Sequence, residues 1–164
     1  MTDSRYNDYA GDMVARAEKK APLPLENQVF ISLLKTADCL AQEVEQNLRQ
    51  HGLTGTQYNV LRILRGAEPQ GLACREVGER MISHDPDMTR LLDRMEKRGL
   101  ITRKRQQEDR RVVRTRVTPA GLALLNKLDE PIRSLHRRQF RHVPYGRLRV
   151  LAGLLGQVAA GVTK

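Results

Sequence analysis

The sequence predicts a mainly helical (α+β) chain that contains one short β-hairpin, and three observations point to this class. Apolar residues recur every three or four positions over most of the chain after residue 25, as in helices that bury one face. Between residues 101 and 117 this pattern gives way to alternation, which is typical of two short strands. The length of 164 residues suits one domain, and 40% hydrophobic residues are enough to bury a core.

Residues 1–24 form a polar stretch with few branched apolar residues, and this stretch ends in two closely spaced prolines. We expect an N-terminal extension and linker here. Three apolar residues would share one face of a helix over residues 8–20, so an extra helix and a frayed tail both fit the sequence.

Residues 25–52 predict one long helix that ends at Gly52. Phe30, Ile31 and Leu34 widen its apolar stripe beyond the face that a small domain can cover. We therefore expect the surplus apolar surface to pack against a second copy of the chain, which makes this a dimerisation helix. The regularly spaced apolar residues are Val29, Leu33, Ala37, Leu40, Val44 and Leu48.

Residues 53–118 show the order of a helix, a turn, a second helix and a third helix followed by the hairpin. Thr54 is expected to cap the first helix, which runs to Arg65. Turn residues follow over 66–71, and the apolar spacing then predicts a short helix over Leu72–Met81. This order indicates a helix-turn-helix unit.

The third of these helices has two contrasting faces. Asp85-Pro86 predicts its start as a cap followed by a first-turn proline, and Gly99 supplies a left-handed exit. One side is therefore expected to pack and the other to meet a polar partner. The apolar stripe consists of Met88, Leu91, Leu92 and Met95, and the opposite side carries Asp87, Arg90, Arg94 and Lys97.

The hairpin is strongly basic. Its strands are expected over residues 101–105 and 112–117, with the charged turn 106–111 between them. Seven Lys or Arg residues stand against Glu108 and Asp109 in the stretch 103–116, which therefore carries half of the chain's formal net charge of +10. A helix sized for a major groove beside an arginine-tipped loop sized for a minor groove predicts a winged helix-turn-helix domain that binds DNA.

Residues 119–164 predict two further helices. Thr118-Pro119 is a cap followed by a proline, and it starts a helix that reaches about Phe140, with Pro131 expected to bend it. Pro144 restarts the chain into a second apolar helix. We expect these C-terminal helices and the helix over 25–52 to form a dimerisation layer.

The run PDMTRLLDRMEKRGLI, the tip DRR and the following VTPAG together resemble the MarR family of bacterial transcriptional regulators. The resemblance extends over roughly Leu25 to Val162. It implies a homodimer that binds double-stranded DNA at an inverted-repeat operator. It also implies base and backbone contacts from the third helix of the domain, the recognition helix, through Asp87, Met88, Thr89, Arg90 and Arg94.

For the wing, the resemblance implies that Asp109 orients Arg111 into a minor groove, with Arg110 between them at the tip. The strands' basic side chains suit phosphates, because phosphate contacts add affinity without sequence information. A plainer alternative is a solvated charged surface with ion pairs such as Asp93 with Lys97. The phosphate-binding candidates are Arg103, Lys104, Arg105, Arg114 and Arg116.

Other function classes find little support in the sequence. The four histidines, of which His84 precedes the recognition helix, show no ligand spacing with Cys39 or Cys74, and no phosphate-loop or nucleophile-elbow motif occurs. We therefore expect no enzyme activity, no metal and no cofactor, and two buried thiols rather than a redox sensor. We also expect no membrane segment and, because no signal peptide is visible at the start, a cytoplasmic protein.

The resemblance further implies a repressor that a small aromatic or phenolic ligand releases from DNA, with a cleft where the helical layer meets the winged domain. The cleft candidates are Phe30, Leu33, Tyr58 and Arg62. The absence of tryptophan argues against urate, which relatives bind with a tryptophan. A constitutive or architectural DNA-binding regulator without an effector is the alternative, and a winged domain for protein or RNA contacts is a more distant one.

Overall fold

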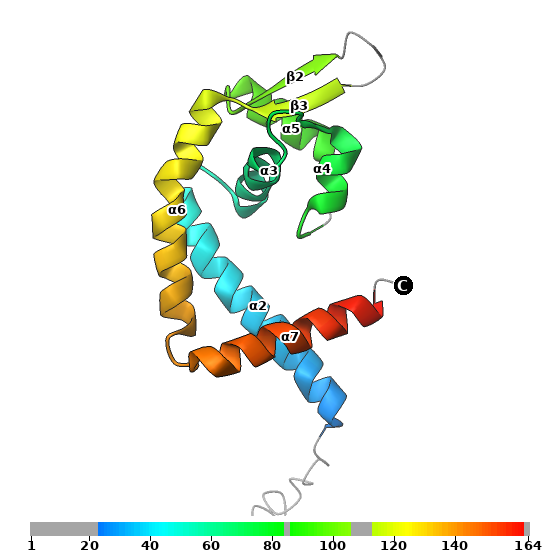
Figure 1. The fold of residues 1–164 in the computed structure, drawn as a ribbon, viewed down its shortest axis with the longest axis vertical. Helices are drawn as coiled ribbons and strands as arrows, with labels where there is room; N and C mark the ends of the chain where they lie inside the picture. Colours follow the sequence, from blue (N-terminus) through cyan, green and yellow to red (C-terminus); the bar gives the residue numbers. More distant parts are fainter. Residues whose placement is uncertain (1–22, 84–85, 106–112, 163–164) are drawn as a thin grey trace, which may run out of the picture. The chain divides into compact units, whose positions relative to one another are not determined.

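The computed structural model describes residues 23–83, 86–105 and 113–162 (Figure 1). The chain separates into two compact units, Met1–Asp38 and Cys39–Lys164, and each is described by itself. The first unit holds, among its described residues, the N-terminal part of α2. The second unit holds every other helix and strand described below.

Helix α2 spans Leu25–Arg49 and confirms the long first helix. Within the first unit it leaves large apolar side chains exposed, among them Phe30 at 62% and Leu34 at 56%. Near its C-terminal end Leu48 is fully buried in the core of the second unit. The apolar surplus expected on this helix is therefore real.

Helix α3 spans Gly55–Arg65 and begins as the sequence predicts. The Thr54 side chain accepts the Gln57 N–H, and the Gln57 side chain accepts the Thr54 N–H, so the two residues form a capping box. Tyr58, Leu61 and Leu64 are buried on the inner face.

The segment 72–81 is not the single helix that the sequence predicts. Leu72 and Ala73 form a short strand, β1, and helix α4 spans Cys74–Arg80. The cause is long-range pairing, because Leu72 lies opposite Thr115 of β3 in an antiparallel register. Local periodicity cannot reveal such a partner.

Strands β2 (Ile101–Arg105) and β3 (Val113–Val117) pair antiparallel, with Ile101 opposite Val117. With β1 they form a three-stranded sheet of order β1-β3-β2. The expected two-stranded wing is thus part of a larger sheet. The wing's tip, residues 106–112, lies outside the described residues.

Helix α6 spans Pro119–Phe140, is capped by Thr118 and continues through Pro131. Asp129 ties it to α3, because both carboxylate oxygens accept hydrogen bonds of 2.9 Å from Arg65. These hydrogen bonds lower the pKa of the Asp129 carboxyl below its ordinary value.

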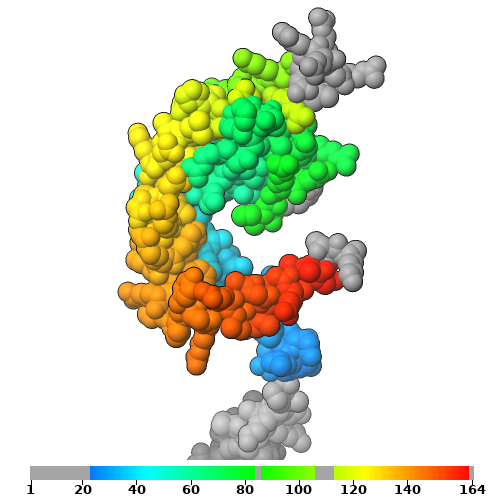
Figure 2. All heavy atoms as spheres, viewed as in Figure 1, coloured from blue at the N-terminus to red at the C-terminus, as the bar shows by residue number. Residues whose placement is uncertain are grey.

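Helix α7 spans Tyr145–Val162 and, among its described residues, buries none. In the space-filling view, no other described part of the second unit covers the face of α7 that is drawn (Figure 2). Its exposed apolar side chains include Val150, Leu151, Leu154, Leu155 and Val158.

The core of the second unit lies between α3, α5, α6 and the sheet. Helix α5, Met88–Lys97, buries Leu91, Leu92 and Met95 there, which confirms its apolar stripe. The mainly helical winged fold is confirmed, with one strand more than predicted. None of the described helices is both long enough and apolar enough to cross a membrane.

Candidate nucleic-acid interface

Helix α5 begins two residues later than the Asp85-Pro86 prediction. Its N-cap is Asp87, whose carboxylate accepts the Arg90 N–H at 3.4 Å and lies 3.3 Å from the Arg90 guanidinium. Pro86 stands in the turn before the helix, because the second acidic residue supplies the cap. Asp85 and His84 lie outside the described residues. Asp87 is thus a capping residue, and Met88 packs partly buried against the core.

The outward face of α5 carries an exposed polar group of side chains. Thr89, Arg90 and Arg94 are exposed there, and Lys97 extends the same face. Within the described ranges Arg94 contacts no carboxylate, so its guanidinium is available to an outside partner. This is the geometry that a groove-binding helix requires.

Arg103 behaves differently from its expected phosphate role. Its guanidinium donates to Asp93 and Glu96 of α5, and its backbone N–H donates to Glu96 at 2.9 Å. The side chain is only 25% exposed. Arg103 therefore braces β2 against the recognition helix.

The two arginines of β3 are also paired with carboxylates. Arg114 donates to Glu76 of α4 at 2.7 Å, and Arg116 donates to Glu68 in the α3–β1 turn at the same distance. Both therefore link the sheet to its neighbours. Lys104 and Arg105 are exposed at the outer end of β2.

The remaining wing candidates are Asp109, Arg110 and Arg111. They lie outside the described residues. Their expected minor-groove contact stays a prediction.

Arg98 is a positioning residue that the sequence patterns did not single out. It forms the C-cap of α5 and donates to the Gln57 side chain at 3.1 Å and to the Gly52 carbonyl at 2.8 Å. The end of the recognition helix is thereby fixed to the start of α3. The basic turn EKRGL offers no local signal for this, since both partners come from an earlier segment.

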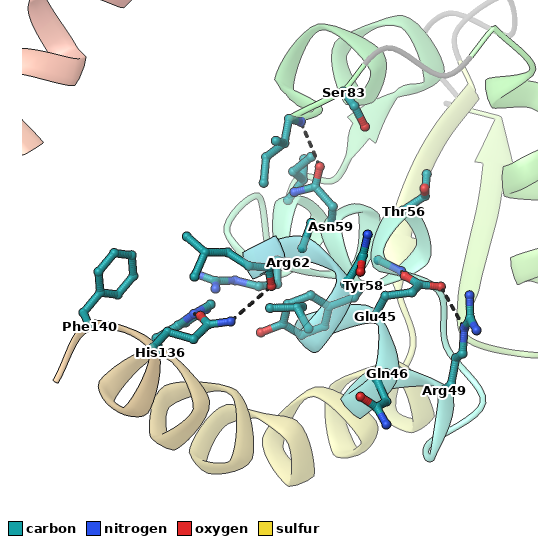
Figure 3. A pocket seen from close by; sticks show the side chains of 18 residues that line it. Glu45, Gln46, Arg49, Thr56, Tyr58, Asn59, Arg62, Ser83, His136 and Phe140 are labelled. Atoms are coloured by element: carbon teal, nitrogen blue, oxygen red, sulfur yellow. Dashed lines mark hydrogen bonds and ion pairs between the residues drawn. The ribbon is translucent and has the colours of Figure 1, made fainter. Parts of the chain in front are cut away.

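A cavity of about 1290 Å³ lies in the second unit, between the C-terminal half of α2, α3 and the end of α6 (Figure 3). Its lining mixes aromatic and cationic groups. The Arg62 guanidinium lies over the Tyr58 ring at 5.9 Å from the centroid, and His136 and Phe140 approach from α6. Such a mixture suits a small aromatic anion.

The cavity contains two of the four predicted cleft residues. Tyr58 and Arg62 line it, whereas Phe30 and Leu33 belong to the first unit and do not. The prediction missed the α6 residues, since the periodicity of α6 marks only its core face. The lining that the sequence did not suggest includes Glu45, Asn59, His136, Gln139 and Phe140.

The two cysteines also depart in part from expectation. Cys39 is exposed, so the predicted burial of both thiols is wrong for it, and Cys74 is half-buried. Among the described residues, no group of three His, Cys, Asp or Glu side chains is arranged to hold a metal ion.

Comparison with known proteins gives one consistent match. The sequence profile of the MarR family matches residues 53–113. A crystal structure of a MarR transcription factor from Planctomyces limnophilus is 39% identical, with a TM-score of 0.64, over 82% of this chain and 97% of that one.

Two sequence relatives are transcription regulators rather than enzymes. The HTH-type transcriptional regulator TtmR of Methylorubrum extorquens (strain PA1) is 30% identical over 117 residues, which are 71% of this chain but only 59% of that protein. The homoprotocatechuate degradative operon repressor of Escherichia coli is 27% identical over 70% of this chain and 76% of its own.

Proposed function

Since the chain belongs to the MarR family of DNA-binding transcriptional regulators, we propose that it is a cytoplasmic, sequence-specific repressor that binds an inverted-repeat operator. A small aromatic or phenolic acid would bind to the repressor and release it from this operator. The observation that carries this proposal is the pairing of an exposed cationic face on α5 with an aromatic and cationic cavity in the same unit.

The DNA contacts would come from two surfaces. Thr89, Arg90 and Arg94 on α5 suit the major groove, where a guanidinium bridges two acceptors of guanine. Lys104 and Arg105 at the outer end of β2 suit phosphates. The wing tip, with Asp109, Arg110 and Arg111, is proposed to enter the minor groove.

A homodimer would present two such helices to successive major grooves. The division into a first dimerisation helix over 25–52, a DNA-binding domain over 53–118 and C-terminal dimerisation helices over 119–164 is part of this proposal. Exposed apolar side chains on α2 and, separately, on α7 support it, because monomeric proteins rarely leave such surface uncovered.

We propose Arg62 as the group that binds the ligand's carboxylate, with Tyr58 and Phe140 contacting its ring. The likeness to a repressor of homoprotocatechuate degradation supports this class, because homoprotocatechuate is a phenolic acid. Binding would release DNA if the ligand prefers a conformation that fits the operator less well.

The DNA-binding surface is tested by two matched variants, Arg94→Ala and Lys104→Ala. Arg94→Ala should weaken binding to the tightest-binding fragment selected from the host genome, called here the best genomic fragment, by about 1–2 kcal/mol and leave binding to scrambled DNA nearly unchanged. Lys104→Ala should weaken binding to both DNAs about equally, and it should make the slope of log K against log salt concentration less steep by about one. Gel-shift titrations measure both effects, and equal losses on both DNAs for Arg94→Ala would contradict a base contact.

The effector site is tested with dihydroxyphenylacetate and related phenolic acids. These ligands should raise the melting temperature of the full chain and reduce its DNA binding. Arg62→Ala should weaken the ligand roughly tenfold, because one charge-assisted hydrogen bond contributes about 1.5 kcal/mol. Arg80→Ala, on α4 and outside the cavity lining, is the control. If none of these phenolic acids changes the melting temperature or the DNA binding, the alternative of a constitutive DNA-binding regulator without an effector is favoured.

A further inference from the structure

A second basic surface lies where α6 meets α7. The segment 133–149, called here the α6–α7 corner, contains six arginines and neither Asp nor Glu, compared with a formal net charge of +10 for the whole chain. All six side chains belong to exposed residues: Arg133, Arg137, Arg138, Arg141, Arg147 and Arg149.

Carboxylates neutralise little of this charge. Arg133 and Arg137 share one partner, Glu130. Arg141 contacts His142, and Arg149 lies over the Tyr145 ring at 5.4 Å from the centroid.

Within the described ranges, Arg138 and Arg147 contact no carboxylate. By contrast, Arg103 of β2 and Arg114 and Arg116 of β3 each have an acidic partner. Arg138 and Arg147 therefore keep a positive charge that is neutralised at Arg103, Arg114 and Arg116.

The helix dipoles account for the arginines at the end of α6 but not for those at the start of α7. Arg137 and Arg138 lie in the last turn of α6, where cations are favourable. Arg147 and Arg149 follow the start of α7, where the dipole disfavours cations, and the first turn of α7 contains no acidic residue. A bound anion would offset both the dipole and the mutual repulsion of these arginines.

The corner is remote from the recognition helix. Helix α6 begins directly after β3 and ends at the corner, and its 22 residues span about 33 Å (Figure 1). A duplex bound across α5 would therefore meet the opposite end of α6. An anion bound at the corner would therefore have to be a different one.

We propose that the α6–α7 corner is a second, sequence-independent surface that binds the phosphate backbone of a separate segment of duplex DNA. Guanidinium groups bind phosphates bidentately, and a duplex offers one charge about every 1.7 Å of its axis. This surface goes beyond the operator contacts proposed for α5 and the wing. It would allow one regulator to bridge two DNA segments.

A capture experiment with the full chain tests this inference. A random-sequence duplex on beads is saturated with protein, and a second, fluorescent duplex of random sequence is then offered between about 50 and 200 mM salt. The variant R138Q/R147Q should capture about tenfold less of the second duplex at low salt, because two phosphate contacts are lost. The control K35Q/K127Q removes two exposed charges elsewhere and should capture as much as the wild type.

Three readouts distinguish the outcomes. Loss of capture by R138Q/R147Q, with unchanged binding to the bead-bound duplex and an unchanged sedimentation coefficient, supports the second surface. Capture equal to the wild type overturns it, and gel-shift titration of Arg94→Ala on the best genomic fragment still reports separately on the proposed function. A dissociated R138Q/R147Q would also overturn it, because these arginines would then pair with carboxylates of a second copy.

Discussion

Replacing Gly121 by alanine is expected to lower the free energy of unfolding by about 3 kcal/mol, at the upper end of the cost of overpacking. A Cβ atom at this position would lie 2.3 Å from the Leu100 carbonyl oxygen and 2.8 Å from a Val117 methyl group. The Leu100 carbonyl belongs to the backbone and accepts the Thr118 N–H, so it cannot move independently. Helix α6 would have to shift away from the junction of α5 and β2.

Thermal unfolding at one fixed protein concentration measures this effect, with an expected fall in Tm of roughly 6–12 °C. Gly78→Ala in α4 is the matched control, because no atom lies within 4 Å of its added Cβ. That control should be neutral or stabilise by up to about 1 kcal/mol through helix propensity. A Gly121→Ala protein as stable as this control would disprove close packing at the start of α6.

Replacing Arg103 by alanine is expected to weaken binding to the best genomic fragment by about 2–3 kcal/mol, although Arg103 itself would contact no DNA. The change leaves Asp93 and Glu96 without their shared cation, and both are only partly exposed on α5. Two uncompensated carboxylates on the recognition helix would repel phosphates and loosen the brace between α5 and β2.

A charge-balanced variant separates this brace from a direct phosphate contact. Arg103→Ala combined with D93N and E96Q removes the carboxylates together with the guanidinium. It should recover most of the lost affinity in gel-shift titrations if Arg103 acts through α5. Affinity as low as that of Arg103→Ala alone would indicate that the guanidinium binds phosphate directly. Arg103→Lys, which keeps the charge but loses the fork, should fall between the two.

The local features of the fold could be predicted because their causes are local. The apolar stripe of α5 follows from the spacing of Leu91, Leu92 and Met95, and the start of α6 follows from Thr118-Pro119. Strand β1 could not be predicted, because Leu72 becomes a strand residue only by pairing with Thr115. The start of α5 was misplaced because Asp85 and Asp87 are both acceptable caps, and local sequence does not decide between them.

The candidate site was predictable to a smaller extent. A count of basic residues located the hairpin, and helical spacing placed Arg90 and Arg94 on the outer face of α5. Counting could not show that Arg103 is neutralised by α5. The cavity also combines Tyr58 of α3 with His136 of α6, which come together only when the helices pack.

The sequence by itself determined the long helices, the two strands of the hairpin, the apolar faces of these elements and the large positive charge of the chain, but not strand β1. Only the tertiary structure decided which of these cations are neutralised: Arg103, Arg114 and Arg116 contact carboxylates, whereas Arg94, Arg138 and Arg147 contact none among the described residues. The physical reason is that the two kinds of information depend on residues at different separations along the chain. Periodicity records the burial of one element's own face, whereas an ion pair forms only within about 4 Å and depends on elements that packing brings together.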